Sequence, residues 1–381
     1  MHRLVQSVGN GGIGMMRKCL LIVFVMIFLL HNPVLVQAQP NVSARNAVLM
    51  EQTTGRVLLE KQAHEKRKIA SITKVMTAII AIESGKMEEL VTVSKRAVYE
   101  EGSSIYLEQG EEIKLKDLVY GLMLRSGNDA ATAIAEHVGG SLEGFAFLMN
   151  QKAEWIGMNN SHFDNPHGLD SDEHYSTAYD MALLTRYAMN NDVFKDISQT
   201  KMYKAENRAY AWGNKNKMLT KYYEYSTGGK TGFTKAAGRT LISTAKKEDM
   251  ELIMVTLNGP DDWNDHRNAF EWGYKNYKLR EIQQKGKVPL ESKDTEKPTG
   301  YLWEDISVPL TDEEFLQLDS LKYVSQPSET EGVHSVVGRA ALSIEGKTII
   351  EAPVMAERKP RTSFVESVIQ MWNRIAGTFH G

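Results

Sequence analysis

The sequence predicts an α/β (α+β) fold in which strands from both ends of one domain form a sheet and a cluster of helices is inserted between them. A small C-terminal β domain is predicted to follow. Two observations support this fold class. After residue 39 the patterned segments run in the order strands, several helices, strands and helix. Beyond about residue 280 the composition shifts toward Lys, Glu, Pro and Thr before strand-like segments return.

The first predicted element is a β-hairpin. Its apolar runs, residues 46–51 and 56–60, flank the polar, glycine-containing segment Gln-Thr-Thr-Gly. Helical spacing takes over at residues 72–84, which end on Gly85, a natural helix C-cap. Further helices are predicted at 115–124, 130–138, 142–155 and 177–189. The pattern then returns to strands at 239–245 and 251–258, followed by a last helix at 263–277.

The N-terminus has the pattern of a secretory signal peptide, which we assign to residues 1–38. Arg17 and Lys18 precede the uninterrupted apolar run 19–30, and Ala38 closes a segment with small residues at the expected cleavage position. This apolar run is too short to span a bilayer comfortably, so an uncleaved anchor is the weaker interpretation. We therefore expect a secreted, extracytoplasmic protein.

Composition and charge exclude several classes of protein. Apolar residues make up 42% of the 381 residues and charged residues 24%, as in ordinary globular proteins. Loss of the signal removes three cations and no acid, so the formal net charge falls from −3 to −6, which argues against nucleic acid as a partner. The only cysteine, Cys19, leaves with the signal, so the mature chain cannot use disulfides, thiolate catalysis or cysteine-ligated metal.

The chain is predicted to contain two domains and a terminal helix. We assign residues 39–280 to the larger domain, 281–299 to a linker and 300–358 to a small β-rich domain that includes a hairpin at 340–351. In the tail, 359–381, apolar side chains recur at three-and-four spacing, as in an amphipathic helix. Such a helix either docks on its own protein or lies in a membrane surface.

Three Ser-x-x-Lys motifs occur, and only their context distinguishes them. They are the pairs Ser71/Lys74, Ser198/Lys201 and Ser243/Lys246. The third pair lies in a predicted strand, where an odd spacing sends its side chains to opposite faces. The second lies in a polar, unpatterned stretch, which we expect to be exposed.

The first pair begins a helix that is apolar almost all round and is therefore expected to be central to its domain. Residues three apart share a helix face, and burial lowers the pKa of a lysine. A neutral amine can take a proton from a hydroxyl, which makes Ser71 a candidate nucleophile and Lys74 its base. The alternative is an ordinary first-turn serine followed by a solvated lysine.

Two further motifs stand later in the chain. Ser126-Gly-Asn128 falls between two predicted helices, where it would also suit a turn with a helix N-cap. Lys230-Thr-Gly232 belongs to the glycine-rich segment 226–234, and a glycine-rich strand edge lets another backbone approach closely. It is not a phosphate-binding P-loop, because the required glycine spacing and the following helix are both missing.

In this order, Ser-x-x-Lys, Ser-x-Asn and Lys-Thr-Gly are the signature of β-lactamases and penicillin-binding proteins. The chain resembles the penicillin-binding D-alanyl-D-alanine carboxypeptidases, and within them most of all the sporulation-specific enzyme of spore-forming bacilli. The resemblance runs from about residue 42 to 280 and is carried by residues 69–77, 122–131, 165–169 and 229–234. It implies the serine β-lactamase/DD-peptidase fold, with an antiparallel sheet flanked by helices.

The resemblance also implies a catalytic role for three side chains. Ser71 would attack the carbonyl between the two terminal D-alanines of a peptidoglycan stem peptide and form an acyl-ester. Lys74 would accept the proton of Ser71, and Ser126 would pass a proton to the leaving amine. Water would then hydrolyse the acyl-ester, and β-lactam antibiotics would acylate the same serine.

Substrate binding is implied for the other motif residues. Asn128 would hold the substrate amide, while Lys230 and Thr231 would bind the terminal carboxylate. The substrate would pair with the strand that contains Gly232, a β-addition mode of recognition. The backbone N–H groups of the nucleophile and of Phe233 would form an oxyanion hole.

Less direct expectations concern cations and location. Lys215 matches a basic position of the family and would tune the lysine cluster, and either His266 or Arg267 would replace a family arginine that helps to bind the carboxylate. No cofactor is expected. The resemblance places the protein on the outer face of a bacterial membrane, in the forespore or cell envelope, with a role in cell-wall metabolism and sporulation.

Four alternatives stay open. A D,D-endopeptidase or transpeptidase could use the same constellation, whereas a serine β-lactamase is disfavoured because no Glu-x-x-Leu-Asn segment is present. A metal-dependent peptidase would rest on the potential ligands His162, Asp164, His167, Asp170 and His174, but no His-Glu-x-x-His accompanies them. We therefore expect no metal. A catalytically inactive wall-binding protein is the last alternative.

Overall fold

The computed structural model describes residues 39–206, 208–291, 299–325 and 335–356. The chain divides into two compact units, residues 1–39 and 40–381, and only the second is described below. The expected signal peptide and the expected C-terminal amphipathic helix lie outside the described residues.

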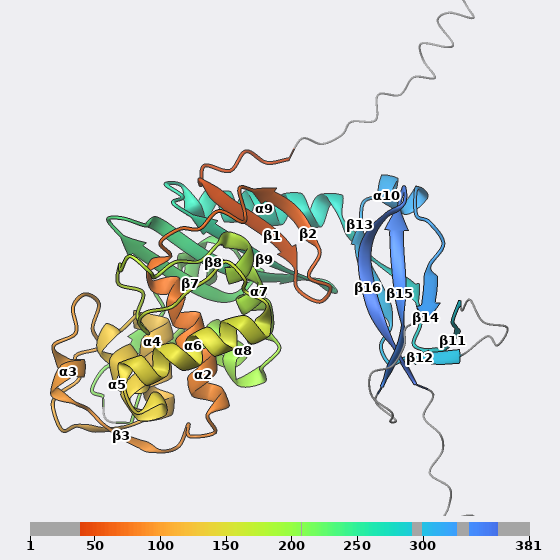
Figure 1. The fold of residues 1–381 in the computed structure, drawn as a ribbon. Coiled ribbons are helices and arrows are strands. Elements are labelled where there is room, and N and C mark those ends of the chain that lie inside the picture. Colours follow the sequence, from red (N-terminus) through yellow and green to blue (C-terminus); the bar gives the residue numbers. More distant parts are fainter. Residues whose placement is uncertain (1–38, 207, 292–298, 326–334, 357–381) are drawn as a thin grey trace, which may run out of the picture. The chain divides into compact units, whose positions relative to one another are not determined.

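The site is built on a five-stranded antiparallel sheet whose strands come from both ends of the larger folded region (Figure 1). Its order is β2 (Val57–Lys61), β1 (Asn46–Glu51), β9 (Met250–Leu257), β8 (Gly238–Lys247) and β7 (Ser226–Thr234). The first hairpin pairs with β9, about 200 residues later, so the fold closes only when both ends meet. Strand β7 is the last in the order, which leaves one of its edges outside the sheet ladder.

The segment between β2 and β7 forms the helical cluster, drawn mostly in orange, yellow and green in Figure 1. It contains a 3-10 helix, η1 (Ala70–Thr73), and the helices α2 (Lys74–Glu83), α3 (Lys95–Val98), α4 (Leu115–Arg125), α5 (Asn128–Gly139), α6 (Leu142–Ile156), α7 (Ala178–Met189) and α8 (Asp192–Gln199). Helix α2 is its axis, because every residue from Lys74 to Ile82 is buried.

Short elements complete the larger region. They are the pair β3 (Leu90–Thr92) and β4 (Glu112–Lys114), the pair β5 (Met202–Tyr203) and β6 (Trp212–Gly213), and the π-helix η2 (Met218–Tyr222). Helix α9 (Asp262–Asn276) packs on one face of the large sheet through Ala269 and Phe270. The helical cluster shares a separate core with the other face, to which Ile242 and Val255 contribute.

The residues after α9 form a second set of strands with its own core. One sheet has the order β11 (Gly286–Pro289), β12 (Thr299–Leu302), β16 (Lys347–Ala356), β15 (Val336–Ile344) and β14 (Lys322–Ser325). Strand β10 (Lys278–Gln283) pairs with β13 (Ile306–Leu310), which is followed by helix α10 (Asp312–Leu316). The predicted hairpin turns at Glu345 and Gly346, which both have positive φ, as a tight hairpin turn requires.

The predicted fold class is confirmed, and so are the first hairpin, the helices predicted from the apolar spacing and the two later strands. The prediction of a linker at 281–299 is wrong in its first half, because β10 and β11 occupy residues 278–283 and 286–289. Its polar composition hid a strand pattern in which Val288 is buried and Ile282 packs on the same core.

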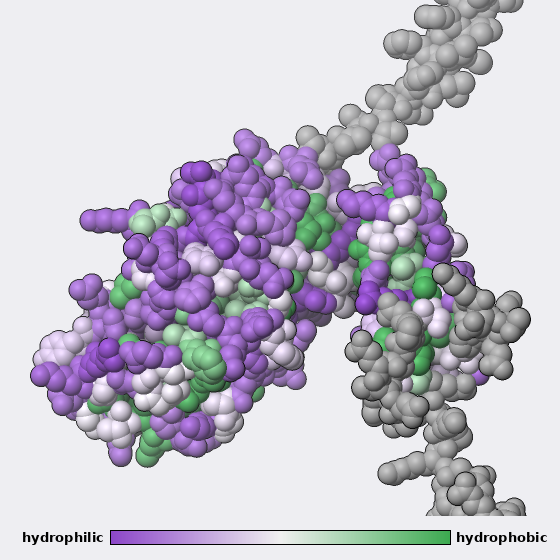
Figure 2. Space-filling model, viewed as in Figure 1, coloured by the Kyte–Doolittle hydropathy of each residue, from purple (hydrophilic) through white to green (hydrophobic). Residues whose placement is uncertain are grey.

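The surface fits a globular protein with its apolar residues inside. On the face shown in Figure 2, hydrophilic residues cover most of the described part and apolar residues form small patches. Among the described helices none is both long and apolar enough to cross a membrane.

Candidate active site

Ser71 and Lys74 lie together where the 3-10 helix η1 passes into α2. Ser71 belongs to η1, Lys74 is the first residue of α2, and the amine Nζ of Lys74 lies 3.1 Å from the hydroxyl Oγ of Ser71. Spacing by three on a tight helical turn places both side chains on one face, as predicted. Ser71 is partly exposed, whereas the side chain of Lys74 is fully buried.

The amine of Lys74 has three neighbours, and two of them can only accept hydrogen bonds from it. Nζ donates to the side-chain oxygen Oδ1 of Asn128 at 2.7 Å and to the backbone oxygen of His167 at 2.6 Å. The carboxamide of Asn128 is held in this orientation because its Nδ2 donates to the backbone oxygen of Glu101. A neutral amine has two hydrogens and one lone pair. In that neutral form the two acceptors use both hydrogens, which leaves the lone pair for the hydroxyl of Ser71.

Electrostatics favour this uncharged form. Burial lowers the pKa of Lys74 well below its usual value, and the nearby charges of Lys230 and Lys215 lower it further. Burial and then Lys215 lower the pKa of Lys230 to about 7. The expected influence of Lys230 and Lys215 on Lys74 is thus present in the structure.

The Ser-x-Asn motif forms the junction between two helices. Ser126 ends α4 in the left-handed conformation, with φ of 65°, Gly127 is the N-cap of α5, and Asn128 is its first residue. This two-residue turn directs the Ser126 hydroxyl to Lys230, whose Nζ donates to it at 3.1 Å. Ser126 at the end of α4 therefore contacts Lys230, and Asn128 at the start of α5 contacts Lys74.

The Lys-Thr-Gly motif lies on the edge strand β7, as predicted. The Nζ of Lys230 also donates to the backbone oxygen of Thr231 at 2.7 Å, which folds the lysine back along the strand. Gly232 has backbone atoms where a side chain would be, because a Cβ there would lie 2.9 Å from the backbone nitrogen of Ser71. The strand thus touches the turn that bears the candidate nucleophile Ser71, and Phe233 follows Gly232 directly.

The loop of residues 162–176 covers the same turn, which agrees with the interpretation of this polar segment as a loop near the active site rather than a metal site. Besides the bond from Lys74 to the His167 backbone, Thr77 on α2 donates to the backbone oxygen of Pro166 at 2.6 Å. The Nε2 of His167 lies 3.5 Å from a carboxylate oxygen of Glu100, and burial lowers the pKa of this histidine to about 3. The only signal for this contact was the Asn-Pro-His-Gly resemblance.

The histidines of this loop do not converge as metal ligands would. His162 faces Asp164 at 3.3 Å, His167 faces Glu100, and Nε2 of His174 lies 2.8 Å from the hydroxyl of Thr73. Within the part of the chain that the structure describes, no group of three or more His, Cys, Asp or Glu residues is placed to hold a metal ion. The donor set of the metal-dependent alternative is therefore dispersed.

Two sequence expectations about other residues need correction. Ser198 is buried rather than exposed, because it lies in the last turn of the amphipathic helix α8 and its hydroxyl accepts the backbone N–H of Gly229 at 2.9 Å. His266 is fully buried on α9, where it contacts the Thr256 hydroxyl at 2.9 Å, and burial lowers its pKa to about 3. Such a histidine is not a cation at neutral pH, so it cannot replace the family arginine.

The remaining candidate site residues do not contribute to the lysine cluster. Arg267 is exposed on α9 and donates to Asn264 at 2.9 Å. Ser243 is buried in β8 and Lys246 is exposed, in agreement with the prediction that this pair lies on opposite faces. Of the three Ser-x-x-Lys pairs, the first is the one that meets the other two motifs.

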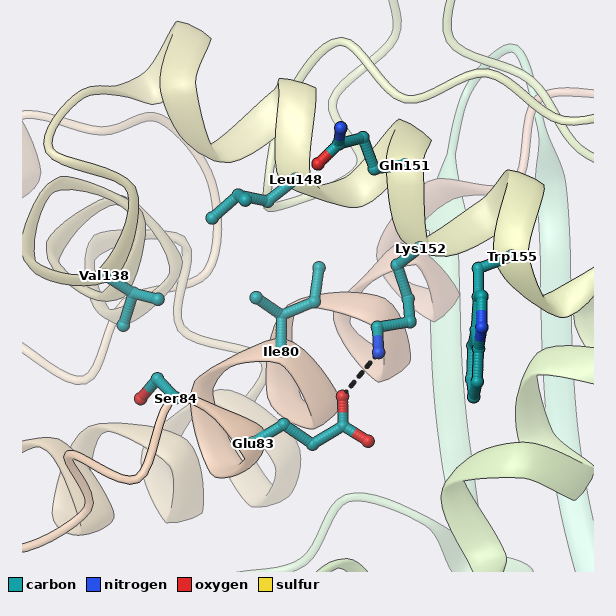
Figure 3. A pocket seen from close by; sticks show the side chains of 8 residues that line it. All are labelled: Ile80, Glu83, Ser84, Val138, Leu148, Gln151, Lys152 and Trp155. Atoms are coloured by element: carbon teal, nitrogen blue, oxygen red, sulfur yellow. Dashed lines mark ion pairs between the residues drawn. The ribbon is translucent and has the colours of Figure 1, made fainter. Parts of the chain in front are cut away.

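A hollow of about 550 Å³ lies at the opposite end of α2 (Figure 3). Ile80 and Leu148 line it, and the ion pair between Lys152 and Glu83, 2.8 Å long, crosses it beside Trp155. Glu83 is nine positions after Lys74 along α2, a rise of roughly 13.5 Å. This hollow is thus separate from the lysine cluster.

The fold and the meeting of the three motifs are those of the serine penicillin-recognising proteins. The chain belongs to the D-alanyl-D-alanine carboxypeptidase family Peptidase S11, whose family model matches residues 34–261.

Curated relatives agree with this assignment. The chain is 39% identical over 222 residues to the D-alanyl-D-alanine carboxypeptidase DacF of Bacillus subtilis, a match that covers 56% of this chain and 57% of the relative. It is 36% identical to DacC of Escherichia coli, with 62% of each chain covered. These matches therefore span less than two thirds of either relative. The match to DacA of Escherichia coli, at 29% identity, covers 89% of both chains.

Solved structures extend the likeness over more of the chain. Penicillin-binding protein 6B of Escherichia coli is 28% identical with a TM-score of 0.66, covering 85% of this chain and 98% of its own. The D-alanyl-D-alanine carboxypeptidase DacD of Francisella tularensis is 25% identical with a TM-score of 0.67, covering 87% and 97%. The fold likeness thus includes strands beyond the family match.

Replacement of Gly232 by alanine tests the contact between β7 and the turn that bears Ser71. The new Cβ would lie 2.4 Å from the Thr240 hydroxyl and 2.9 Å from the Ser71 nitrogen, so strand and turn must separate. Because an oxyanion hole depends on such positions, we expect Gly232→Ala to slow acylation of Ser71 by a fluorescent penicillin at least roughly 100-fold. Gly213→Ala is the control, since nothing lies within 4 Å of its added Cβ. Acylation of folded Gly232→Ala at the wild-type rate would contradict this account.

Proposed function

We propose that this protein is a serine-type D-alanyl-D-alanine carboxypeptidase that removes the terminal D-alanine from peptidoglycan stem peptides. The observation that carries the proposal is the environment of Lys74, whose two acceptors and lowered pKa leave a lone pair for the hydroxyl of Ser71. Membership of the D-alanyl-D-alanine carboxypeptidase family supports the choice of substrate.

In the first step Ser71 Oγ attacks the carbonyl carbon of the bond between the two D-alanines, and its proton moves to Nζ of Lys74. The backbone N–H groups of Ser71 and Phe233 hold the negative charge that develops on the carbonyl oxygen. The contact of Gly232 with the Ser71 nitrogen supports this role, since it brings the two segments together. This attack gives a tetrahedral intermediate that is bonded to Ser71 and carries the negative charge on the former carbonyl oxygen.

In the second step the carbon–nitrogen bond breaks and the leaving amine takes a proton through Ser126. The hydroxyl of Ser126 lies 3.1 Å from Nζ of Lys230, so a proton passed to the amine is replaced from that side. A pKa of about 7 suits Lys230 to proton exchange at neutral pH. D-alanine departs and the shortened peptide stays on Ser71 as an ester. The proton that Lys74 took from Ser71 replaces the one that Lys230 gave up, so Lys74 is neutral and Lys230 protonated again before water attacks.

In the last step a water molecule attacks the ester carbonyl, with Lys74 again taking the proton. The oxyanion collapses, the ester carbon–oxygen bond breaks, and Ser71 recovers its hydrogen. A β-lactam would follow the first step in the same way, because its amide carbonyl offers the same electrophile. Its opened ring would remain attached to Ser71.

We propose that substrate binds along the free edge of β7. Lys230 and Thr231 would attract the terminal carboxylate, and the substrate backbone would extend the sheet by one strand. The structure changes the role that we assign to Asn128. Its Oδ1 accepts from Lys74 and its Nδ2 donates to the Glu101 backbone, so we propose that Asn128 primarily orients the lysine rather than the substrate amide.

The cellular setting is also a proposal. We infer that the protein acts outside the cytoplasm on the cell wall, after cleavage of a signal peptide at residues 1–38, with residues 39–280 as the catalytic part. The match to the Bacillus subtilis carboxypeptidase DacF supports a role in sporulation. The amphipathic pattern of residues 359–381 supports peripheral attachment to the outer face of a membrane.

Incubation with benzylpenicillin tests the proposed nucleophile. Intact-mass analysis and peptide mapping should show one adduct on Ser71, and the protein should release D-alanine from a peptide that ends in D-Ala-D-Ala. Ser71→Ala should lose both activities, at least roughly 1,000-fold. Ser243→Ala, which removes the serine of another Ser-x-x-Lys pair, should keep them.

A label on another serine, or no label at all, would refute the mechanism. Labelling of Ser71 without release of D-alanine would instead favour the transpeptidase or endopeptidase alternative, which uses the same cluster on a different acceptor or bond.

Removal of the charge of Lys215 tests the lowered pKa values of Lys74 and Lys230. Lys215 lowers the pKa of Lys74 and of Lys230. Its replacement by glutamine should raise both, so that a higher pH is needed to leave Lys74 neutral. We expect the acid limb of the pH profile of the acylation rate to move to higher pH by roughly half a unit. Lys246→Gln, which removes a lysine paired with Glu251 at 2.8 Å, should leave the limb unchanged. A shift of the Lys215 variant to lower pH would contradict the account.

A further inference from the structure

His174 is a buried histidine that the proposed reaction leaves without a role. Its residue is 1% exposed. The ring lies edge-on to Phe163, with centroids 5.7 Å apart, and the flanking backbone is fixed by paired hydrogen bonds between His162 and Tyr175 at 2.9 and 3.0 Å. The ring is thus held rigidly against the turn that bears the nucleophile.

The hydrogen bonds of this ring run in one direction. The backbone N–H of Asp164 donates to Nδ1 of His174 at 3.1 Å, so Nδ1 carries no hydrogen. Burial lowers the pKa of His174 to about 4, and the neutral ring therefore carries its hydrogen on Nε2. Nε2 then donates to the hydroxyl of Thr73 at 2.8 Å, and that hydroxyl donates to the backbone oxygen of Ala70 at 2.8 Å.

The chain of hydrogen bonds ends on a strained residue. Ala70 has a φ of 50°, a left-handed conformation that costs energy in a residue with a Cβ, and it directly precedes Ser71. Gly168 packs directly against the same carbonyl, since a Cβ on Gly168 would lie 2.0 Å from the Ala70 oxygen. The orientation of this peptide unit decides where the Ser71 hydroxyl and N–H point.

We propose that His174 is a positioning residue for the nucleophile. Through the hydroxyl of Thr73 it holds the Ala70 carbonyl, and thereby keeps the Ala70–Ser71 turn in the conformation in which Ser71 faces Lys74. His174 itself touches neither substrate nor Lys74 in this role. The inference rests on the proposed function, because it concerns the same nucleophile.

Two matched pairs of variants test this role. Glutamine at position 174 places an amide nitrogen near the former Nε2 and can still donate to Thr73, whereas asparagine reaches only the position of Nδ1 and keeps the contact with Asp164. Thr73→Ser keeps the hydroxyl, and Thr73→Val replaces it with a methyl group of similar volume. Each variant is measured in the full mature chain for the acylation rate at saturating chromogenic β-lactam, for the KM and for thermal unfolding.

We expect His174→Asn and Thr73→Val to lower the saturated rate about 10-fold to 100-fold with the KM within about twofold, as for a misplaced reacting group. His174→Gln and Thr73→Ser should stay within about threefold of wild type. The double variant His174→Asn/Thr73→Val should be no slower than the worse single variant, because both act through one chain of hydrogen bonds.

Wild-type rates in Thr73→Val, or a loss in His174→Gln as large as in His174→Asn, would overturn the inference while the proposed function stood. If His174→Asn fails to fold, the two Thr73 variants decide alone. A wild-type protein that no β-lactam acylates would refute the proposed function, and this inference with it.

Discussion

The amine of Lys74 is surrounded by two hydrogen-bond acceptors and one hydroxyl, and the other parts of the site are arranged around it. An ammonium group would have a third hydrogen and no lone pair to receive the proton of Ser71. Asn128 and the His167 backbone accept hydrogen bonds from the amine and so fix its orientation, while burial and neighbouring cations select the neutral form by electrostatics. The acceptors thus orient the amine, and its electrostatic surroundings set its charge.

This arrangement reduces the stability of the fold. Lys230 has a pKa of about 7 in the folded protein and about 10.4 when unfolded, so the unfolded chain binds more protons between these values. Stability therefore rises with pH across that window, and below it the buried charge carries its full cost. The apolar packing of α2, buried from Lys74 to Ile82, and the two cores on either side of the sheet offset this cost.

Sequence patterns predicted what depends on local spacing. The proximity of Ser71 and Lys74 follows from one helical turn, and the edge position of Lys230 followed from glycine-rich composition near strands. Apart from the meeting of the three motifs, which the family resemblance implied, contacts between distant segments were not predicted. The hydroxyl of Ser198 meets the backbone of β7, and His174 meets Thr73 from about 100 residues away. Neither contact leaves a periodic signal, because each partner lies in a different element and only the folded sheet brings them together.

The charge state of one amine is the central claim, and it can be measured directly. In protein labelled with ¹³Cε-lysine, the resonance of Lys74 is identified by its loss in Lys74→Ala and followed through a pH titration. The account predicts a transition well below the ordinary lysine pKa of about 10.4. A transition near that ordinary value would show that Lys74 is charged at neutral pH and would contradict the account.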